Sequence, residues 1–346
     1  MTGDRRFHRT IGIDYSGAET AEASLKGLRV YQTLGDSAAE EVFPPAGPKK
    51  YWTRHGLADW LIDTLDGSIP TVVGIDHGFS FPMRYFERHG LEPDWPSFLE
   101  DFCAHWPTDG KHTYVDFVRD GSVGNGAARQ GERHWRRLTE EAAGSAKSVF
   151  HFDVQGQVAK STHAGLPWLR KIRQARPEVH FWPFDGWAPG QGGSVILEAY
   201  PRLWSGIYDS ETRTQDQHDA YSIARWLQEA TVSGALDQAF APPQPESVAM
   251  TALVEGWILG TTWPPVGKSA SRPKRTDPRI SPSTATGYVN RNGQEVLSRT
   301  GQSGTDHNQV VYILKCHHCG ARYGANGSDI FQRRCPDCGN GRPGLP

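Results

Sequence analysis

The chain has 346 residues, of which 37% are hydrophobic and 11% are aromatic. This is enough to bury one substantial core beside a small second module. The N-terminal stretch has no apolar segment typical of a secretion signal, and no run approaches the 18 or so apolar residues of a membrane span. The composition therefore argues against secreted and membrane-spanning proteins, and we expect a cytoplasmic one.

The charge is unevenly distributed, although the net charge is only −2. From Thr261 onward there are 12 Lys and Arg against 5 Asp and Glu, whereas the preceding 260 residues carry 25 against 34. A basic tail on an acidic body suggests an anionic partner for the tail. A basic surface that serves only solubility is the alternative.

Strand-like and helix-like segments alternate along residues 1–262, which predicts an α/β domain. Short β-branched runs predict strands at 9–16, 22–25, 28–34, 71–76 and 194–200. Helical spacing of apolar residues predicts helices at 51–65, 215–230 and 247–259. The glycine- and aromatic-rich stretch 77–193, with helical signals at 95–106 and 166–176, is interpreted as an insertion on the core sheet.

A change in composition marks the boundary of the domain. Residues 263–284 are rich in Pro, Ser and basic residues and predict an extended linker. In the module that follows, 285–346, alternating residues around an Asn-Gly turn predict a short β-hairpin. A second strand at 309–316 runs directly into a CxxC motif.

Four of the five cysteines lie in the last 31 residues, as two CxxC pairs separated by fifteen residues. In a cytosolic chain, paired CxxC elements indicate metal ligands rather than disulfides. Each pair turns two thiolates toward one ion, and tetrahedral Zn²⁺ needs both pairs. The spacing therefore predicts a zinc ribbon with one structural Zn²⁺ and no open position for catalysis, held by Cys316, Cys319, Cys335 and Cys338.

Three of the predicted strands carry an acid near the C-terminal end, namely Asp14, Asp76 and Glu198. Ligand sites in open α/β sheets gather at this end of the strands, and a buried carboxylate needs a partner or a cation. Asp219 projects from the core-facing stripe of the predicted helix at 215–230, with Asp216 on nearly the same side. One such acid alone could cap a helix or a turn. Acids on four separate elements are interpreted as a shared site for Mg²⁺ or Mn²⁺.

The segment order, together with the motifs GIDYSG, GIDHGFSFP, LEAYP and QHDAYSIARWL, resembles the ribonuclease H-like fold. More narrowly, it resembles a family of uncharacterised bacterial domains described as predicted nucleases. The resemblance covers about residues 9–262 and is poor over the long middle. It implies a mixed sheet with flanking helices, and phosphodiester hydrolysis by a two-metal mechanism. The metal ligands that it implies are Asp14, Asp76 and Asp219, with Glu198 completing the site.

Nucleic acid is the expected partner, and a protein partner of the ribbon stays open. Arginines grouped with aromatic residues suit phosphate contact and base stacking. We expect such contacts from Arg133, Arg136, Arg137, Arg322, Arg333 and Arg334.

Two other functions stay open. The chain could be a non-catalytic adaptor that binds nucleic acid or protein. It also resembles actin-like ATPases, whose first strand likewise ends in an Asp followed by a Gly/Ser turn that cradles phosphate. Against that function, the chain has one such core where those enzymes use two, and it has no GxxxxGK[ST] loop.

Overall fold

The computed structural model describes residues 6–152, 158–264, 282–305 and 309–345. The chain divides into two compact units, Met1–Gly267 and Lys268–Pro346. Most of the predicted linker lies outside the described residues. Within the described part of the chain, no helix is both long and apolar enough to cross a membrane.

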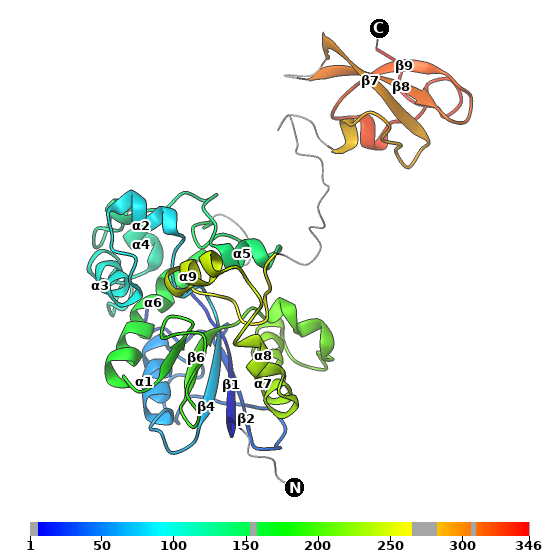
Figure 1. Cartoon of the computed structure of the whole chain (residues 1–346). Helices are drawn as coiled ribbons and strands as arrows, with labels where there is room; N and C mark the ends of the chain where they lie inside the picture. The colour runs from blue at the N-terminus through cyan, green and yellow to red at the C-terminus, as the bar shows by residue number, and fades with distance from the viewer. Residues whose placement is uncertain (1–5, 153–157, 265–281, 306–308, 346) are drawn as a thin grey trace. The chain divides into compact units, whose positions relative to one another are not determined.

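A six-stranded mixed sheet forms the centre of the N-terminal unit (Figure 1), with the spatial order β3-β2-β1-β4-β6-β5. Strands β1, β4, β6 and β5 run parallel, whereas β2 runs antiparallel to β1 and to β3. The predicted strand at 22–25 is wrong, because these residues form turns before β2. The strands are β1 (Arg9–Asp14), β2 (Arg29–Leu34), β3 (Glu40–Glu41), β4 (Thr71–Asp76), β5 (His180–Trp182) and β6 (Val195–Glu198).

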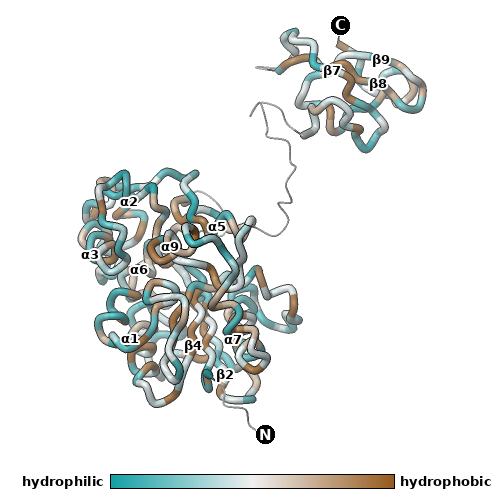
Figure 2. The backbone as a smooth tube through the Cα atoms, viewed as in Figure 1, coloured by the Kyte–Doolittle hydropathy of each residue, from teal (hydrophilic) through white to brown (hydrophobic). Residues whose placement is uncertain are grey.

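Helices cover both faces of this sheet. In Figure 1 the strands run between α1 and α6 on one side and α7 and α8 on the other. Apolar residues concentrate on the central strands and on the inward faces of the helices (Figure 2). The bounds of these four helices are α1 (Arg54–Thr64), α6 (Val158–Ala175), α7 (Gln215–Ser233) and α8 (Ala235–Ala239).

Helix α7 lies unusually close to the sheet because two glycines face it. Gly12 of β1 and Gly74 of β4 are register partners. A Cβ built on Gly12 would lie 2.1 Å from the Ala220 carbonyl oxygen, and one on Gly74 would lie 2.6 Å from Ile223. Helix α7 begins with a capping box of Thr214 and Gln217, which precedes the residues that contact the two glycines. The glycines therefore bring the first turns of α7 against the ends of β1 and β4.

The predicted insertion contains most of the remaining helices. Within the described residues between β4 and β6 there are five α-helices, one short 3-10 helix and the edge strand β5, and α9 follows after α8. Aromatic side chains fill the space among them, for example Phe81, which contacts Tyr85, Phe98 and Phe150. The additional helices are α2 (Met83–His89), α3 (Trp95–His105), α4 (Val115–Arg119), α5 (Leu138–Ala142) and α9 (Glu246–Glu255).

The C-terminal unit is a three-stranded antiparallel sheet in the order β7-β8-β9. A small core of buried side chains, including Val296, Leu314 and Ile330, lies on it. The predicted hairpin is present only as a tight turn at Gly293, with one bridge between Val289 and Glu295. The strands are β7 (Gln294–Ser303), β8 (Val310–Cys316) and β9 (Arg322–Asn326).

Candidate functional site

Asp14 and Asp76 lie side by side at the carboxyl ends of β1 and β4, as register partners in parallel strands. Side chains alternate between the faces of a strand, so both aspartates share the face of Gly12 and Gly74. That face is the one covered by α7. Both residues are half-buried. Among the described residues, no hydrogen bond or ion pair reaches either carboxylate.

The first turns of α7 bring two more acids to the same place. Asp219 directly precedes Ala220, whose carbonyl faces Gly12. Asp216 lies one turn earlier, and its Oδ2 is 3.4 Å from the position of a Cβ on Gly27, in the loop between β1 and β2. The structure therefore places Asp14, Asp76, Asp216 and Asp219 at this end of the sheet, near enough for their charges to act on Asp14.

Negative charge dominates the electrostatics of these aspartates. Burial, then Asp76, Asp216 and Asp219, raise the pKa of Asp14 well above its ordinary value, and Arg29 only partly opposes them. Burial, Asp219 and Glu198 raise the pKa of Asp76 to about 8. Burial also raises the pKa of Asp219. A cation among these carboxylates would remove the repulsion that causes the shifts.

The aspartate oxygens do not yet converge on a single point. No three acids of the described chain have ligand oxygens that all lie within 4.8 Å of one another. Asp219 Oδ1 and Oδ2 accept hydrogen bonds of 3.0 and 2.9 Å from the Gln215 amide.

Glu198 does not join the aspartates. It is the register partner of Ile75, one residue before Asp76, so its side chain points to the opposite face of the sheet. There it is 3% exposed, and both of its carboxylate oxygens accept 2.7 Å hydrogen bonds from Arg137. Ala199 occupies the level of Asp76 on the α7 face. We correct the predicted role of Glu198 accordingly: it is held in a buried ion pair rather than offered to a metal.

Arg137 is the centre of a buried charge network that joins the insertion to β6. Its guanidinium also donates to Glu140 Oε1 at 2.9 Å and to the Glu255 carbonyl at 3.2 Å. Glu255 accepts 2.7 Å hydrogen bonds from two backbone N–H groups, those of Met83 and Leu138. Burial raises the pKa of Glu140 to about 7 and also raises that of Glu255, although Arg137 opposes both shifts. Two carboxylates and one backbone carbonyl thus bind the Arg137 guanidinium, which is therefore not available to nucleic acid.

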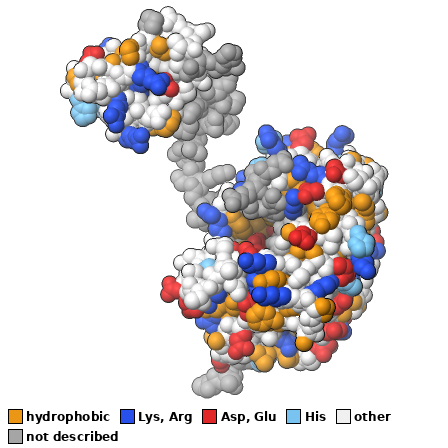
Figure 3. Space-filling model, turned by 180° about the vertical axis from the view of Figure 1, so that it is seen from behind, with side chains coloured by type: hydrophobic (Ala, Val, Ile, Leu, Met, Phe, Trp, Pro, Cys, Tyr) orange, Lys and Arg blue, Asp and Glu red, His pale blue; other side chains and the backbone are white. Residues whose placement is uncertain are grey.

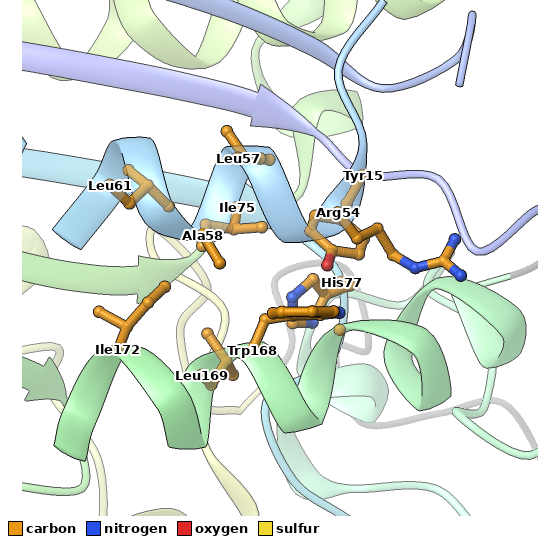
Figure 4. A pocket seen from close by; sticks show the side chains of 11 residues that line it. Tyr15, Arg54, Leu57, Ala58, Leu61, Ile75, His77, Trp168, Leu169 and Ile172 are labelled. Carbon is orange, nitrogen blue, oxygen red and sulfur yellow. The ribbon is translucent and has the colours of Figure 1, made fainter. Parts of the chain in front are cut away.

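His77 follows Asp76 but faces the other side of the sheet. It is buried, and its Nδ1 lies 2.8 Å from the Gly78 carbonyl oxygen. Burial lowers its pKa to about 4, so the ring is neutral at pH 7. A cavity of about 10 Å³ is lined by His77 together with residues of α1 and α6. Figure 4 shows His77 beside Tyr15 and Trp168 at this cavity. His77 therefore packs behind the aspartates and does not face them.

The arginines predicted to contact nucleic acid in the N-terminal unit differ in accessibility. Arg133 is exposed, and its Nε donates to His134 Nε2 at 3.2 Å. Arg136 donates to the carbonyls of Glu140 and Ala146. Like Arg137, Arg136 therefore binds groups of the protein itself, which corrects its predicted role in nucleic-acid contact.

The four cysteines of the C-terminal unit lie together, as predicted. All their sulfur atoms are within 4.8 Å of one another, with Cys316 Sγ 3.6 Å from Cys338 Sγ and Cys319 Sγ 3.5 Å from Cys335 Sγ. A disulfide needs about 2.05 Å, whereas thiolates about 2.3 Å from a tetrahedral Zn²⁺ lie about 3.8 Å apart. The group can therefore hold a structural metal such as zinc.

Neighbouring donors support the thiolate form of Cys316. Its Sγ accepts from Gln294 Nε2 at 3.5 Å, and Tyr323 holds that amide through a 2.8 Å hydrogen bond to Oε1. Burial would raise the pKa of Cys316, but the backbone N–H groups of Cys319 and His318 and the Gln294 amide lower it to about 6. Such outer contacts orient metal ligands.

The predicted arginines of the ribbon also divide into two groups. Arg322 and Arg334 are exposed, and Lys and Arg side chains are visible on this unit in Figure 3. Arg333 is 7% exposed, donates to the carbonyls of Arg342 and Pro343, and lies over the Tyr323 ring. Arg333 therefore holds the fold together, which corrects its predicted role.

Comparison of the chain with models of known protein families, with curated proteins and with solved structures finds no match. The chemistry of the site therefore has to be inferred from its own geometry.

One residue beside the site escaped the sequence analysis. Arg54, the first residue of α1, is 0% exposed, and its guanidinium binds the loop that follows Asp14. It donates to the carbonyls of Ser16, Ala18 and Glu19 at 3.2, 2.7 and 3.0 Å. No sequence signal separates such an arginine from an ordinary exposed one at the start of a helix.

Proposed function

We propose that the N-terminal unit is a metal-dependent nuclease and that the C-terminal zinc ribbon engages the nucleic acid. The observation that carries the proposal is the set of aspartates, on three separate elements, that lie near one another at the carboxyl end of the sheet and form no ion pair within the described residues. Asp14 and Asp76 come from paired strands, and Asp219 with Asp216 from the helix against them.

The topology also supports the proposal. A mixed sheet, in which β2 is antiparallel to β1 and β1, β4 and β6 are parallel, with helices on both faces, agrees with the mixed sheet and flanking helices that the resemblance to ribonuclease H-like proteins implies. In that resemblance the ligands are acids of the first strand, the fourth strand and the last helix of the domain core. The positions of Asp14, Asp76 and Asp219 agree with this.

The residues fit a hard divalent cation. The donor set consists of carboxylate oxygens, which Mg²⁺ and Mn²⁺ prefer, and repulsion among the acids raises the pKa values of Asp14 and Asp76. Such cations activate a water molecule and stabilise the charge that develops on a leaving phosphate oxygen. Asp14, Asp76 and Asp219 would hold them, with Asp216 in the place that the sequence analysis had given to Glu198.

The protein's own contribution is to fix these carboxylates. The close approach of α7 to Gly12 and Gly74 sets the distance between the helix and the strand ends. Glu198 and Arg137 anchor the insertion to the adjacent strand, and Glu198 Oε2 accepts from the Phe79 N–H at 3.2 Å. This contact restrains the chain just after Asp76.

The test is cleavage of DNA and RNA, single- and double-stranded, by the full chain with Mg²⁺ or Mn²⁺. We expect cleavage by the wild type, and at least a 100-fold loss in Asp14→Asn and Asp76→Asn. The matched control is Asp63→Asn, an exposed acid of α1, which should leave the rate unchanged. A wild type that cleaves none of these substrates would contradict the proposal.

The ribbon is tested separately, by binding rather than by cleavage. Exposed arginines in a basic unit contribute sequence-independent affinity that falls with salt concentration. We expect Arg322→Gln with Arg334→Gln to weaken nucleic-acid binding by the full chain several-fold and to flatten its salt dependence. If binding is unchanged, the ribbon has another partner, and a protein is then the leading candidate.

A further inference from the structure

We infer that residues 43–51, which follow the edge strand β3, bind single-stranded nucleic acid, with one base stacked on the ring of Phe43. The inference rests on the proposed function and deepens it, because it names single strands as the substrate class of the aspartate site. It uses residues that hold no metal, namely the rings of Phe43 and Tyr51 and the lysines beside them.

Phe43 lies at the same end of the sheet as the aspartates. The N–H of Val42 donates to the Val30 carbonyl oxygen at 2.8 Å, which continues the pairing of β3 with β2 by one residue. Phe43 therefore comes to the level of Arg29, and Arg29 is the register partner of Asp14. Two strand spacings, or about 10 Å, separate the backbone of Phe43 from that of Asp14. A strand of nucleic acid at the aspartates can thus pass over Phe43.

The side chain of Phe43 is on the aspartate face of the sheet. Glu41 bonds to Arg29 and to Gln217 of α7, so its side chain is on the face that α7 covers. Side chains alternate along an extended chain, and Val42 accordingly packs against the core on the opposite face. The same alternation returns Phe43 to the α7 face.

Phe43 is exposed although its backbone is well held. Its side chain is 62% exposed, and no Phe, Tyr or Trp of the described residues is more exposed. The carbonyl of the preceding Val42 accepts from Trp52 Nε1 at 2.8 Å. Pro44 follows directly and restricts Phe43 to extended backbone. A ring that is already held in place loses little conformational freedom when a base stacks on it.

Tyr51 adds a second ring with cations beside it. Arg29 Cζ lies 4.7 Å from the centre of this half-buried ring, and Lys50 Nζ lies 5.3 Å from it. Phe43 and Tyr51 both adjoin Arg29, so the two rings form one aromatic surface next to the aspartates. Aromatic rings alternating with cations are the combination by which proteins bind single-stranded nucleic acid.

The charge around the aromatic surface favours a polyanion over an apolar partner. Lys26 and Lys50 are exposed, and within the described residues neither forms an ion pair. Lys26 belongs to the segment whose backbone bonds to residues 51–52. Of the acids on the edge strand, Glu41 is held in an ion pair and Glu40 lies further from the carboxyl end of the sheet. Two unpaired lysines are therefore available to the phosphates of a strand.

Stacking on the exposed Phe43 ring selects single strands. The faces of a base in a duplex are covered by the neighbouring base pairs, whereas an unpaired base can turn out and stack on an aromatic side chain. Every base has such a face, so the contact tolerates any sequence. We expect a preference for single strands over duplexes, with little dependence on sequence and in both DNA and RNA.

The experiment is titration of fluorescent oligonucleotides, as single strands and as duplexes, with the full chain and no added Mg²⁺ or Mn²⁺. Phe43→Ala should weaken single-strand binding about tenfold and leave duplex binding within twofold of wild type. Phe43→Tyr keeps a ring and should bind within twofold of wild type, whereas Phe43→Leu keeps only apolar surface and should resemble Phe43→Ala. The matched control is Leu34→Ala, whose side chain is 53% exposed at the opposite end of β2 and whose binding should equal that of wild type.

A single strand with 2-aminopurine, whose fluorescence falls when the base stacks, gives a second measurement. Placed at successive positions, it should be quenched at one or two adjacent positions by wild type and at none by Phe43→Ala. The inference is overturned if single strands do not bind, or if Phe43→Ala binds and quenches as wild type does; Phe43 is then a surface for a protein. If wild type and Phe43→Ala cleave single strands equally, the aromatic surface is excluded and the nuclease proposal stands. If binding depends on Phe43 but no substrate is cleaved with Mg²⁺ or Mn²⁺, the nuclease proposal fails and the aromatic surface stands.

Discussion

Asp14 and Asp76 are register partners in two parallel strands, and their carboxylates share the face of the sheet that α7 covers. The charge is concentrated there because α7 adds Asp219 and Asp216, while Arg29, the cation that acts on Asp14, is itself paired with Glu41 at 2.8 Å. Glu198, the third acid at the strand ends, is neutralised on the opposite face. We therefore expect the repelling aspartates to destabilise the folded state and the paired Glu198 to stabilise it, and both effects can be measured.

Removal of Asp76 should stabilise the metal-free protein. The folded state raises its pKa to about 8, above an unfolded value of about 3.9. The folded state thus retains a proton that the unfolded state has lost, so stability falls as pH rises from about 4 to 8. We expect Asp76→Asn to gain about 1 kcal/mol or more at pH 8, or about 2–4 °C in Tm, and to gain little at pH 4.

Thermal unfolding of wild type and Asp76→Asn across this pH range, without added divalent ions, measures the effect. Mg²⁺ should raise the Tm of wild type and not that of Asp76→Asn. An equal response of the two proteins to pH would show that Asp76 does not carry the repulsion.

Truncation of Glu198 should have the opposite sign. Glu198→Ala leaves Arg137 buried with part of its partners lost, and breaking a buried pair costs about 3–5 kcal/mol. The double variant Glu198→Met with Arg137→Met removes both charges and should recover much of this loss. Urea unfolding of the single and double variants gives the coupling. If Glu198→Ala is as stable as wild type, the buried ion pair is not what holds the insertion to β6.

Asp76 and Glu198 differ in the face of the sheet on which they lie, and this difference could not be predicted from the sequence. The predicted strands at 71–76 and 194–200 are present because each is a short, strongly apolar run bounded by turn residues. The face on which a side chain lies depends on the register with the next strand, and a shift of one residue reverses it. The motifs IDHG and LEAY do not contain that information, which comes from the pairing of Ile75 with Glu198.

The same limit applies to the insertion and to the arginines. Arg133, Arg136 and Arg137 are nearly adjacent in sequence, yet one is exposed and two are bound to the interior. Their environments are set by Glu198 and by Glu140, which belong to different elements. In contrast, the CxxC spacing is local, and the sulfur positions could be predicted from it.

Gly12 should be intolerant of a side chain. A Cβ there would lie 2.1 Å from the Ala220 carbonyl oxygen and 2.5 Å from the Ala224 nitrogen, both of which belong to the backbone of α7. The helix would have to move away from the sheet, at a cost of about 1–3 kcal/mol or more. Gly193→Ala is the matched control, because nothing lies within 4 Å of its added methyl group.

Two measurements check the effect of Gly12→Ala. Urea unfolding should show the loss of stability, and Mg²⁺ binding should weaken, because the displacement separates Asp219 from Asp14. Unchanged Mg²⁺ affinity in a folded Gly12→Ala protein would mean that the position of α7 does not set the site.

The C-terminal unit should depend on its metal while the N-terminal unit does not. Its core is small, and the four cysteine sulfurs draw together the turn after β8 and the chain after Ile330. A unit of this size needs such a link, and metal binding then contributes directly to folding. We expect one zinc per chain by elemental analysis, and its loss together with the fold of this unit in Cys335→Ser. Cys103→Ser, in the N-terminal unit, should retain the zinc. Amide hydrogen exchange resolves the two units, and continued protection of β8 in zinc-free Cys335→Ser would show that the cysteines are not needed to hold the ribbon.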